Sequence, residues 1–346
     1  MNAGTAILET FYRTAGQFVP AIQLAKLLRT HPEKIAVEAA ELERLGYVIE
    51  LHPHRGYRLL ESPDRLMADD LEARLGTDPT KQRVIGSEIL VFEETASTND
   101  VCEQLARSGG RDGLVVFAES QMRGRGRRGR VWASPRGKGL WFSVLLRPRL
   151  PLSSAPRITV AASVAVARVV REASGLDARI KWPNDVTVQG KKLAGILVET
   201  SARFDESSKE QPQAPTSGAG VPPGQCVILG IGINVNCTAA DLPPEVAAIA
   251  TSMELEAHRA FDRPALAVAV LQALDDVYLT AQTDFDSIVA EWARLSTTLG
   301  KQIVVTMGKR RIEGCAQALD GDGALLVRKD DGQVERMLSG DLVQEL

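Results

Sequence analysis

Cysteine is scarce in this chain of 346 residues, and the few that occur are widely spaced. The four positions are Cys102, Cys226, Cys237 and Cys315. None belongs to a Cys-x-x-Cys pair, which argues against a cysteine-based metal site. A disulfide framework is equally unsupported, because bridged domains carry cysteine at high density. This usage fits a protein of a reducing cytoplasm.

Long apolar segments are also missing. Residues 1–16 contain neither a basic cluster nor an extended apolar run, so no export signal is evident. The longest aliphatic stretch, residues 160–170, is interrupted by Arg168 and is too short to cross a bilayer. Apolar residues make up 44% of the chain and charged residues 25%, as in ordinary globular domains. We therefore expect a soluble cytoplasmic protein of more than one domain, with no membrane partner.

Acidic residues are absent from one stretch, residues 121–138, whose sequence is QMRGRGRRGRVWASPRGK. It carries six Arg and one Lys, although the whole chain has a formal charge of −3. Four glycines lie among these cations, so the backbone can adopt positive φ and bring its N–H groups close to a ligand. Arginine offers a planar fork of donors that matches carboxylate or phosphate oxygens. The pattern predicts a loop that binds a small anion.

A basic Gly/Arg run is also typical of a disordered segment or a nonspecific RNA contact. The flanking residues favour the loop, because residues 113–120 and 139–147 are both predicted as buried strands. A loop held between two core strands is a lid or clamp. RNA binding stays open as a rival, and it predicts an affinity that falls steeply with salt.

Residues 1–62 predict three helices followed by a two-stranded hairpin. The helices are expected at residues 5–14, 21–30 and 33–45, and the strands at 47–51 and 56–60. This order is that of a winged helix-turn-helix, a fold that binds nucleic acid. The third helix, however, carries four glutamates against one lysine and one arginine, and clustered carboxylates oppose contact with a polyanion. A regulatory or dimer-supporting role is therefore favoured over DNA binding.

A connecting segment follows this domain. Ser62-Pro63-Asp64 places a capping residue before a proline at the first helical position, which predicts a helix over residues 64–75. After a strand at residues 87–94, Ser97, Thr98 and Asn99 stand just before a helix that runs to about residue 108. The default interpretation is a helix cap. The alternative is a pocket, since unpaired N–H groups at a helix N-terminus favour polar ligands.

The middle of the chain places charged residues beside core strands. A buried helix is expected at residues 154–174, and apolar strands at 193–200 and 227–235. Between the helix and the first of these strands lie the polar and aromatic residues Lys181, Trp182, Asn184, Asp185 and Lys192. A Pro-Asn-Asp turn is a routine connector, but charged groups near a core are costly unless they meet a partner. In the last strand, Asn234 follows two glycines, which indicates either a ligand contact or a tightly packed central strand.

The remaining segments predict an insertion and a C-terminal domain. Residues 205–224 hold four Pro, three Gly and three Ser, so a disordered surface insertion is expected. Helices at residues 263–282 and 284–295 come next. Residues 301–346 alternate short strands with Asp-Gly turns, a pattern that suggests a small β-barrel.

Four motifs occur in the order in which biotin protein ligases carry them. They are GRGRRGR at 124–130, KWPND at 181–185, KLAGILVE at 192–199 and GIGINVN at 230–236. The chain therefore resembles that family over nearly its whole length. The resemblance implies an α+β architecture in four parts. These are a winged helix-turn-helix at 1–62, a linker helix and connection at 63–86, a mixed-sheet catalytic domain of the biotin/lipoate ligase type at 87–296, and an SH3-like β-barrel at 297–346.

The resemblance also implies a two-step reaction. The carboxylate of biotin attacks the α-phosphate of ATP, with Mg²⁺, to give biotinyl-5′-AMP and pyrophosphate. A lysine of a biotin carboxyl carrier protein then accepts the biotinyl group. Two anions must meet in the first step, so an arginine loop that closes over them would supply charge and exclude water.

Site residues follow from the motif positions. Biotin contacts are assigned to Ser97, Thr98, Asn99, Gln121, Arg125, Gly126, Arg127 and Lys192. Adenylate contacts are assigned to Arg125, Arg127, Arg130, Trp132, Lys181, Asn184 and Asn234. The catalytic candidates are Arg127, Lys192 and Asp185, with Asp185 accepting or orienting the proton of the acceptor lysine. No metal site made of side chains alone is assigned.

Two alternatives remain within the resemblance. One is a biotin-sensing, DNA-binding repressor, and the other is a lipoate-type ligase of the same fold. Repressor members usually have a basic recognition helix, and this helix is acidic, which puts operator DNA as a partner in doubt. The GRGRRGR and KWPND strings favour biotin over lipoate. Whether the chain forms a homodimer stays open.

Overall fold

The computed structural model describes residues 2–76, 83–148, 151, 154–200 and 226–345. These residues form two compact units. The first comprises Met1–Gln82 with Asp262–Val268, and the second Arg83–Phe261 with Ala269–Leu346. The insertion expected at residues 205–224 lies outside the described residues.

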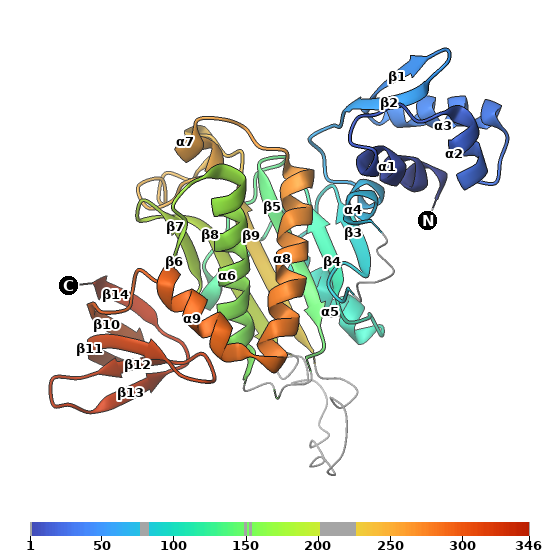
Figure 1. Cartoon of the computed structure of the whole chain (residues 1–346). Coiled ribbons are helices and arrows are strands. Elements are labelled where there is room, and N and C mark those ends of the chain that lie inside the picture. The colour runs from blue at the N-terminus through green and yellow to red at the C-terminus, as the bar shows by residue number, and fades with distance from the viewer. Residues whose placement is uncertain (1, 77–82, 149–150, 152–153, 201–225, 346) are drawn as a thin grey trace, which may run out of the picture. The chain divides into compact units, whose positions relative to one another are not determined.

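The first unit contains the predicted helices and hairpin (Figure 1). The elements are α1 (Ala3–Arg13), α2 (Ala21–Leu27), α3 (Pro32–Arg44), β1 (Val48–His52) and β2 (Gly56–Glu61). They form because their apolar residues recur on one face, and Ile7, Leu24 and Ile35 meet in a common core without exposed surface.

The next helix, α4 (Ala68–Leu75), begins later than the prediction of residue 64. Asp64 does not start it, because its carboxylate is engaged elsewhere. It accepts hydrogen bonds from the backbone N–H and the guanidinium of Arg263, which are 3.0 and 3.3 Å away. Arg263 lies 199 positions downstream, so no local sequence pattern could have predicted this pairing.

The buried carboxylate of Asp70 joins α4 to other parts of the first unit. Asp70 is 1% exposed, and its Oδ1 accepts hydrogen bonds from the hydroxyls of Tyr12 and Tyr47. Its Oδ2 lies 2.8 Å from Nε of Arg74. A buried charge persists only with partners of this kind. The helix expected to connect two domains thus packs against α1 within the first unit.

A mixed sheet with strand order β3-β4-β5-β9-β8-β7-β6 organises the second unit. The strands are β3 (Glu88–Phe92), β4 (Leu114–Ala118), β5 (Gly139–Leu146), β6 (Arg179–Lys181), β7 (Asp185–Val188), β8 (Lys191–Thr200) and β9 (Val227–Asn234). The pair β3 and β4 is parallel, and every other neighbouring pair is antiparallel. The central mixed sheet expected from the sequence is confirmed.

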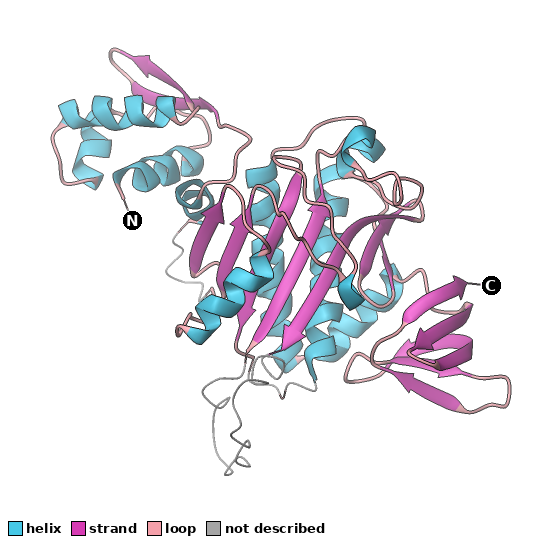
Figure 2. Ribbon diagram, turned by 180° about the vertical axis from the view of Figure 1, so that it is seen from behind, coloured by secondary structure: helices cyan, strands magenta, loops and turns pink. Residues whose placement is uncertain are grey.

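Helices cover both faces of this sheet (Figures 1 and 2). One face carries α6 (Ala155–Ser174), α9 (Phe285–Leu295) and the part of α8 (Arg263–Thr283) from Ala269 onward. The other face carries α5 (Thr98–Arg107). A short helix, α7 (Met253–Ala257), was not predicted. By length and composition α8 could cross a membrane, but 67% of its most apolar window is buried, as in a core helix of a soluble protein.

The described C-terminal residues form a five-stranded antiparallel sheet of order β13-β12-β11-β10-β14. Its strands are β10 (Gln302–Met307), β11 (Arg310–Leu319), β12 (Leu325–Arg328), β13 (Val334–Met337) and β14 (Asp341–Glu345). The predicted turn between β11 and β12 forms around Asp320, whose Oδ1 accepts from the N–H groups of Asp322 and Ala324, each at 2.9 Å. Short strands joined by Asp-Gly turns are therefore confirmed.

Candidate active site

A cavity of about 680 Å³ is lined by the start of α5 and by the glycines of β9 that face it. Every residue that the sequence assigned to biotin, adenylate or catalysis lines it. The set is Ser97, Thr98, Asn99, Gln121, Arg125, Gly126, Arg127, Arg130, Trp132, Lys181, Asn184, Asp185, Lys192 and Asn234. Four motifs that are distant in sequence therefore share one cavity.

Glycines make the floor of the cavity. A Cβ atom on Gly230 would lie 2.3 Å from Oδ1 of Asn99, and one on Gly232 would lie 2.5 Å from Nε1 of Trp132. Gly195 faces Gly232 in the β8–β9 register, and its Cβ would lie 3.0 Å from the Trp132 ring. Any larger residue would push these side chains off the sheet. The weak Gly-x-Gly-x-Asn signal thus marks a close packing site for cavity side chains.

Polar groups gather at the start of α5. Ser97 occupies the N-cap position, but its side chain makes no capping hydrogen bond, so the default cap interpretation is wrong. Oε1 of Gln121 accepts from the first helical N–H, that of Thr98, at 2.9 Å. Sequence reasoning missed Ser143, which it placed in a core strand. Its hydroxyl is fully buried and lies 2.7 Å from Oγ1 of Thr98 and 2.5 Å from Oδ1 of Asn99.

The basic loop is an ordered hairpin between β4 and β5, as predicted from its flanks. Arg125 and Val131 form a bridge, and the N–H of Gly126 donates to the carbonyl of Arg130 at 2.7 Å. Positive φ does occur in the loop, at Gly129 (75°) and Gly137 (69°), and also at the non-glycine Arg128 (55°). It does not occur at Gly126, whose φ is −107° and whose N–H is used inside the loop.

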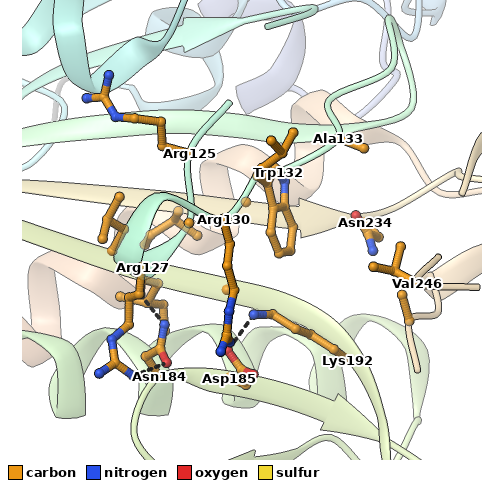
Figure 3. Close-up of a pocket in the computed structure, with 18 of the residues that line it drawn as sticks. Arg125, Arg127, Arg130, Trp132, Ala133, Asn184, Asp185, Lys192, Asn234 and Val246 are labelled. Atoms are coloured by element: carbon orange, nitrogen blue, oxygen red, sulfur yellow. Dashed lines mark hydrogen bonds and ion pairs between the residues drawn. The ribbon is translucent and has the colours of Figure 1, made fainter. Parts of the chain in front are cut away.

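Arg127 reaches into the cavity and binds neutral groups. Its Nη1 donates to Oδ1 of Asn184 at 3.2 Å, and its Nη2 donates to the carbonyl of Gly340 at 3.1 Å (Figure 3). Burial lowers the pKa of the Arg127 guanidinium, although an arginine remains protonated at neutral pH. A partly desolvated cation with neutral partners favours an anionic ligand.

Arg125 is held differently, and Figure 3 shows its guanidinium directed away from Arg127 and Lys192. It forms ion pairs with Asp100 and with Glu199, the latter at 3.4 Å. Burial alone would lower the pKa of Arg125, but its hydrogen bond to Asp100 and the charge of Glu199 outweigh that effect and raise it. The expected contact of Arg125 with the ligand stays a prediction.

The loop also contacts the C-terminal sheet. Arg128 forms an ion pair with Asp341 at the start of β14, and Nη2 of Arg130 lies 3.4 Å from Oδ1 of the same residue. Asp341 lines the cavity too. Sequence reasoning missed it, because nothing local links one acid in a C-terminal strand to a loop more than 200 positions earlier.

Lys192 and Asp185 form a charged pair in the cavity. Nζ of Lys192 lies 2.6 Å from Oδ1 of Asp185 and 5.2 Å from the centre of the Trp132 ring (Figure 3). Antiparallel pairing of β7 with β8 brings the two residues together. Asn184 is fixed beside them, because its Nδ2 donates to the carbonyl of Ile196 at 2.7 Å. The KWPND and KLAGILVE motifs thus meet through strand register.

Two further side chains bear on the choice of ligand. The indole N–H of Trp132 is buried and has no hydrogen-bond partner among the described residues. A ligand acceptor would satisfy it, since an unpaired buried donor is costly. Asn234 is held by its Nδ2, which donates to the carbonyl of Thr251 at 2.9 Å.

Comparison with known proteins agrees with the motifs. The family model described as "Biotin/lipoate A/B protein ligase family" matches residues 91–208, and "Biotin protein ligase C terminal domain" matches residues 298–343. The bifunctional ligase/repressor BirA of Bacillus subtilis is 31% identical over 337 residues, which cover 97% of each chain. The biotin–[acetyl-CoA-carboxylase] ligase of Paracoccus denitrificans is 33% identical over 254 residues, 70% of this chain and 95% of that one.

A solved structure gives the same answer. The biotin protein ligase of Aquifex aeolicus in complex with biotin and ATP has a TM-score of 0.60 and 26% identity. The match covers 74% of this chain and 97% of that chain. With a relative above 30% identity along almost its full length, this chain belongs to the biotin protein ligase family.

Proposed function

We propose that the protein activates biotin with ATP and transfers the biotinyl group to a lysine of a biotin carboxyl carrier protein. The observation that carries this proposal is the single cavity in which Arg127, Lys192 and the polar start of α5 surround a glycine floor. The Paracoccus relative is named a biotin–[acetyl-CoA-carboxylase] ligase, and the Aquifex structure holds biotin and ATP.

Biotin is placed at the α5 end of the cavity. The ureido ring of biotin is small and polar, and it needs both donors and acceptors. Ser97 and Thr98 supply hydroxyls, and Asn99 and Gln121 supply amides, all beside the first turn of α5. The Ser143 hydroxyl and Gln121 hold Thr98 in place, so this group is ordered before a ligand arrives.

The adenylation step is placed at the arginine loop. A carboxylate oxygen of biotin forms a bond to the α-phosphorus of ATP, the bond from that phosphorus to the bridging oxygen breaks, and pyrophosphate leaves. Charge develops on the phosphoryl oxygens, and we assign its stabilisation to Arg127 and Lys192, two cations that line the cavity. Gly126 and Arg130 border this region, Trp132 covers the adenylate, and Lys181, Asn184 and Asn234 contact the nucleotide.

A magnesium ion fits this arrangement only in company with the nucleotide. The described residues contain no group of three His, Cys, Asp or Glu that could hold a metal. Mg²⁺ is usually bound through one or two carboxylates together with substrate phosphates. Asp185 offers such a carboxylate, next to the amide oxygen of Asn184. When bound with ATP, the ion neutralises part of the triphosphate charge.

The transfer step is placed at Asp185. The amine of the carrier lysine attacks the carbonyl carbon of the biotinyl-AMP anhydride, an amide bond forms, and AMP leaves with the bonding electrons. The attacking amine must lose a proton, and the Asp185 carboxylate accepts or orients it. The ammonium of Lys192, 2.6 Å away, holds that carboxylate in position.

We also propose a domain organisation, a cellular location and a possible second function. Residues 1–62 form a winged helix-turn-helix, 63–86 a connection, 87–296 the catalytic domain, and 297–346 an SH3-like barrel. The chain works in the cytoplasm. The Bacillus subtilis relative is named a bifunctional ligase/repressor and is matched along its N-terminal part, which favours repression and operator DNA as a second function. Against it, Glu33, Glu41 and Glu43 are all exposed on α3.

One experiment tests the main proposal. The purified protein is incubated with ATP, Mg²⁺, biotin and a carboxylase carrier domain, and the carrier mass is measured. We expect one biotinyl group per carrier, and none when ATP is omitted or when the acceptor lysine is replaced by arginine. Lack of both carrier modification and biotin-dependent pyrophosphate exchange would overturn the proposal. Reaction with lipoate in place of biotin would support the lipoate-type alternative, and operator binding without adenylation would support a biotin sensor.

A further inference from the structure

Glu199, near the end of β8, contacts both the start of α5 and the basic loop, which are distant in the sequence. Its Oε2 accepts a hydrogen bond from Nδ2 of Asn99 at 2.7 Å and lies 3.4 Å from Nη2 of Arg125. The Glu199 side chain is 18% exposed. Asn99 belongs to the biotin end of the cavity, and Arg125 belongs to the stem of the basic loop. One carboxylate oxygen therefore serves both.

Asn99 is fixed from three strands. The Ser143 hydroxyl on β5 lies 2.5 Å from its Oδ1, and the bare backbone of Gly230 on β9 leaves room for the amide. Glu199 on β8 binds the Nδ2 end. Asn99 is 5% exposed, so losing the carboxylate would leave a buried amide without its charged acceptor.

Arg125 pairs with a second acid besides Glu199, so the contacts of Arg125 can be tested apart from the contact between Glu199 and Asn99. Asp100, on the first turn of α5, pairs with Nη1 of Arg125, whereas Nη2 faces Glu199. No hydrogen bond joins Asp100 to Asn99 through side chains in the described part of the chain. Removing Asp100 therefore breaks one ion pair of Arg125, whereas removing Glu199 breaks the other ion pair of Arg125 and the hydrogen bond to Asn99 together.

We propose that Glu199 is a positioning residue that couples the biotin end of the cavity to the basic loop. It acts through Asn99 and Arg125, because Glu199 itself is not among the residues that line the cavity. The carboxylate holds the Asn99 amide by a hydrogen bond and the Arg125 guanidinium by an ion pair. This inference rests on the proposed function, since it takes biotin as the ligand at Asn99.

The test compares Glu199→Ala with the matched control Asp100→Ala by calorimetric titration of biotin into the full chain. Glu199→Ala should weaken biotin binding roughly tenfold or more, because it leaves the buried Asn99 amide unsatisfied. Glu199→Gln, which keeps an acceptor but no charge, should recover part of that loss. Asp100→Ala should leave the biotin dissociation constant within about twofold, because the Asp100 side chain bonds Arg125 and leaves the hydrogen bonds of the Asn99 amide in place. Thermal unfolding of each variant is measured alongside.

If Glu199→Ala lowers the unfolding temperature, weaker biotin binding could result from a damaged fold. A double variant then tests the proposal. When Glu199 acts through Asn99, the double variant Asn99→Ala/Glu199→Ala should bind biotin no more weakly than Asn99→Ala alone. Additive losses, or a Glu199→Ala protein that binds biotin as the wild type does, would refute the role of Glu199. A wild-type protein that fails to bind biotin at all would refute the proposed function instead.

Discussion

Replacing Arg127 by methionine should remove most biotin activation and leave the fold in place. Methionine keeps the length of the side chain and deletes the charge. Removal of one preorganised donor from a site of developing negative charge typically lowers the rate by about 10²–10³. Arg127 is such a donor on geometric grounds, since it lines the cavity and its hydrogen-bond partners are two neutral oxygens.

The cost to stability should be moderate. The variant loses two hydrogen bonds from a charged donor, at 3.2 and 3.1 Å, each worth about 1.5–3 kcal/mol. Removing a partly buried cation offsets some of that loss, as the lowered pKa of Arg127 indicates. The net change in the free energy of unfolding should be about 2–4 kcal/mol, which is less than the total stability of about 5–15 kcal/mol that is typical of folded proteins.

The neighbouring arginine supplies the control. Arg128 lies on the same loop but does not line the cavity, and it pairs with Asp341. Exposed ion pairs of this kind contribute about 0–1 kcal/mol, so Arg128→Met should retain biotin-dependent pyrophosphate exchange within about fivefold. Equal losses in the two variants, or wild-type exchange by Arg127→Met, would show that Arg127 is not the cation that meets the reacting phosphate.

Three further outcomes are expected. Gly232→Ala should displace the Trp132 indole and cost about 1–3 kcal/mol of stability together with ATP affinity, and an unshifted tryptophan emission spectrum would contradict the packing argument. Lys192→Ala should abolish adenylation without unfolding the chain, because Lys192 meets Asp185 and not the core; calorimetry and pyrophosphate exchange check both parts. Burial, and then the adjacent carboxylate, raise the pKa of Tyr47. Stability from this group is therefore complete below about pH 10 and falls at higher pH as the unfolded tyrosine ionises, so Tyr47→Phe should flatten the alkaline decline seen in denaturant titrations.

The sequence predicts most elements of this fold, because their apolar residues recur with the period of a helix or a strand. It also predicts the cavity residues, since four motifs are specific in combination and strand pairing brings them together. The backbone conformation at these residues is harder to predict from the sequence. Gly126 illustrates this, because a glycine beside arginines suggests positive φ, and its φ is in fact −107°.

The parts that sequence reasoning missed depend on distant partners. Ser97 looks like a helix cap, but its side chain makes no capping hydrogen bond, and the N–H of Thr98 donates to Gln121, 23 positions after Thr98. Asp64 looks like a helix start, but Arg263, 199 positions later, takes its carboxylate. Glu199 ends an apolar strand and gives no local sign that it binds Asn99, 100 positions earlier. Each is a polar side chain whose partner is set by tertiary packing, which a local pattern does not encode.

The charge of the basic loop can be explained by sorting its arginines by partner. A run of cations would repel itself in isolation, and acids from other elements relieve that repulsion here. Arg125 meets Asp100 and Glu199, and Arg130 meets Asp341. Arg127, by contrast, meets only neutral oxygens among its hydrogen-bond partners in the described part of the chain. Arg125 and Arg130 therefore help to keep the loop folded without a ligand. Among the loop arginines that line the cavity, Arg127 is the one that makes hydrogen bonds only to neutral groups, which leaves its charge for an anionic ligand.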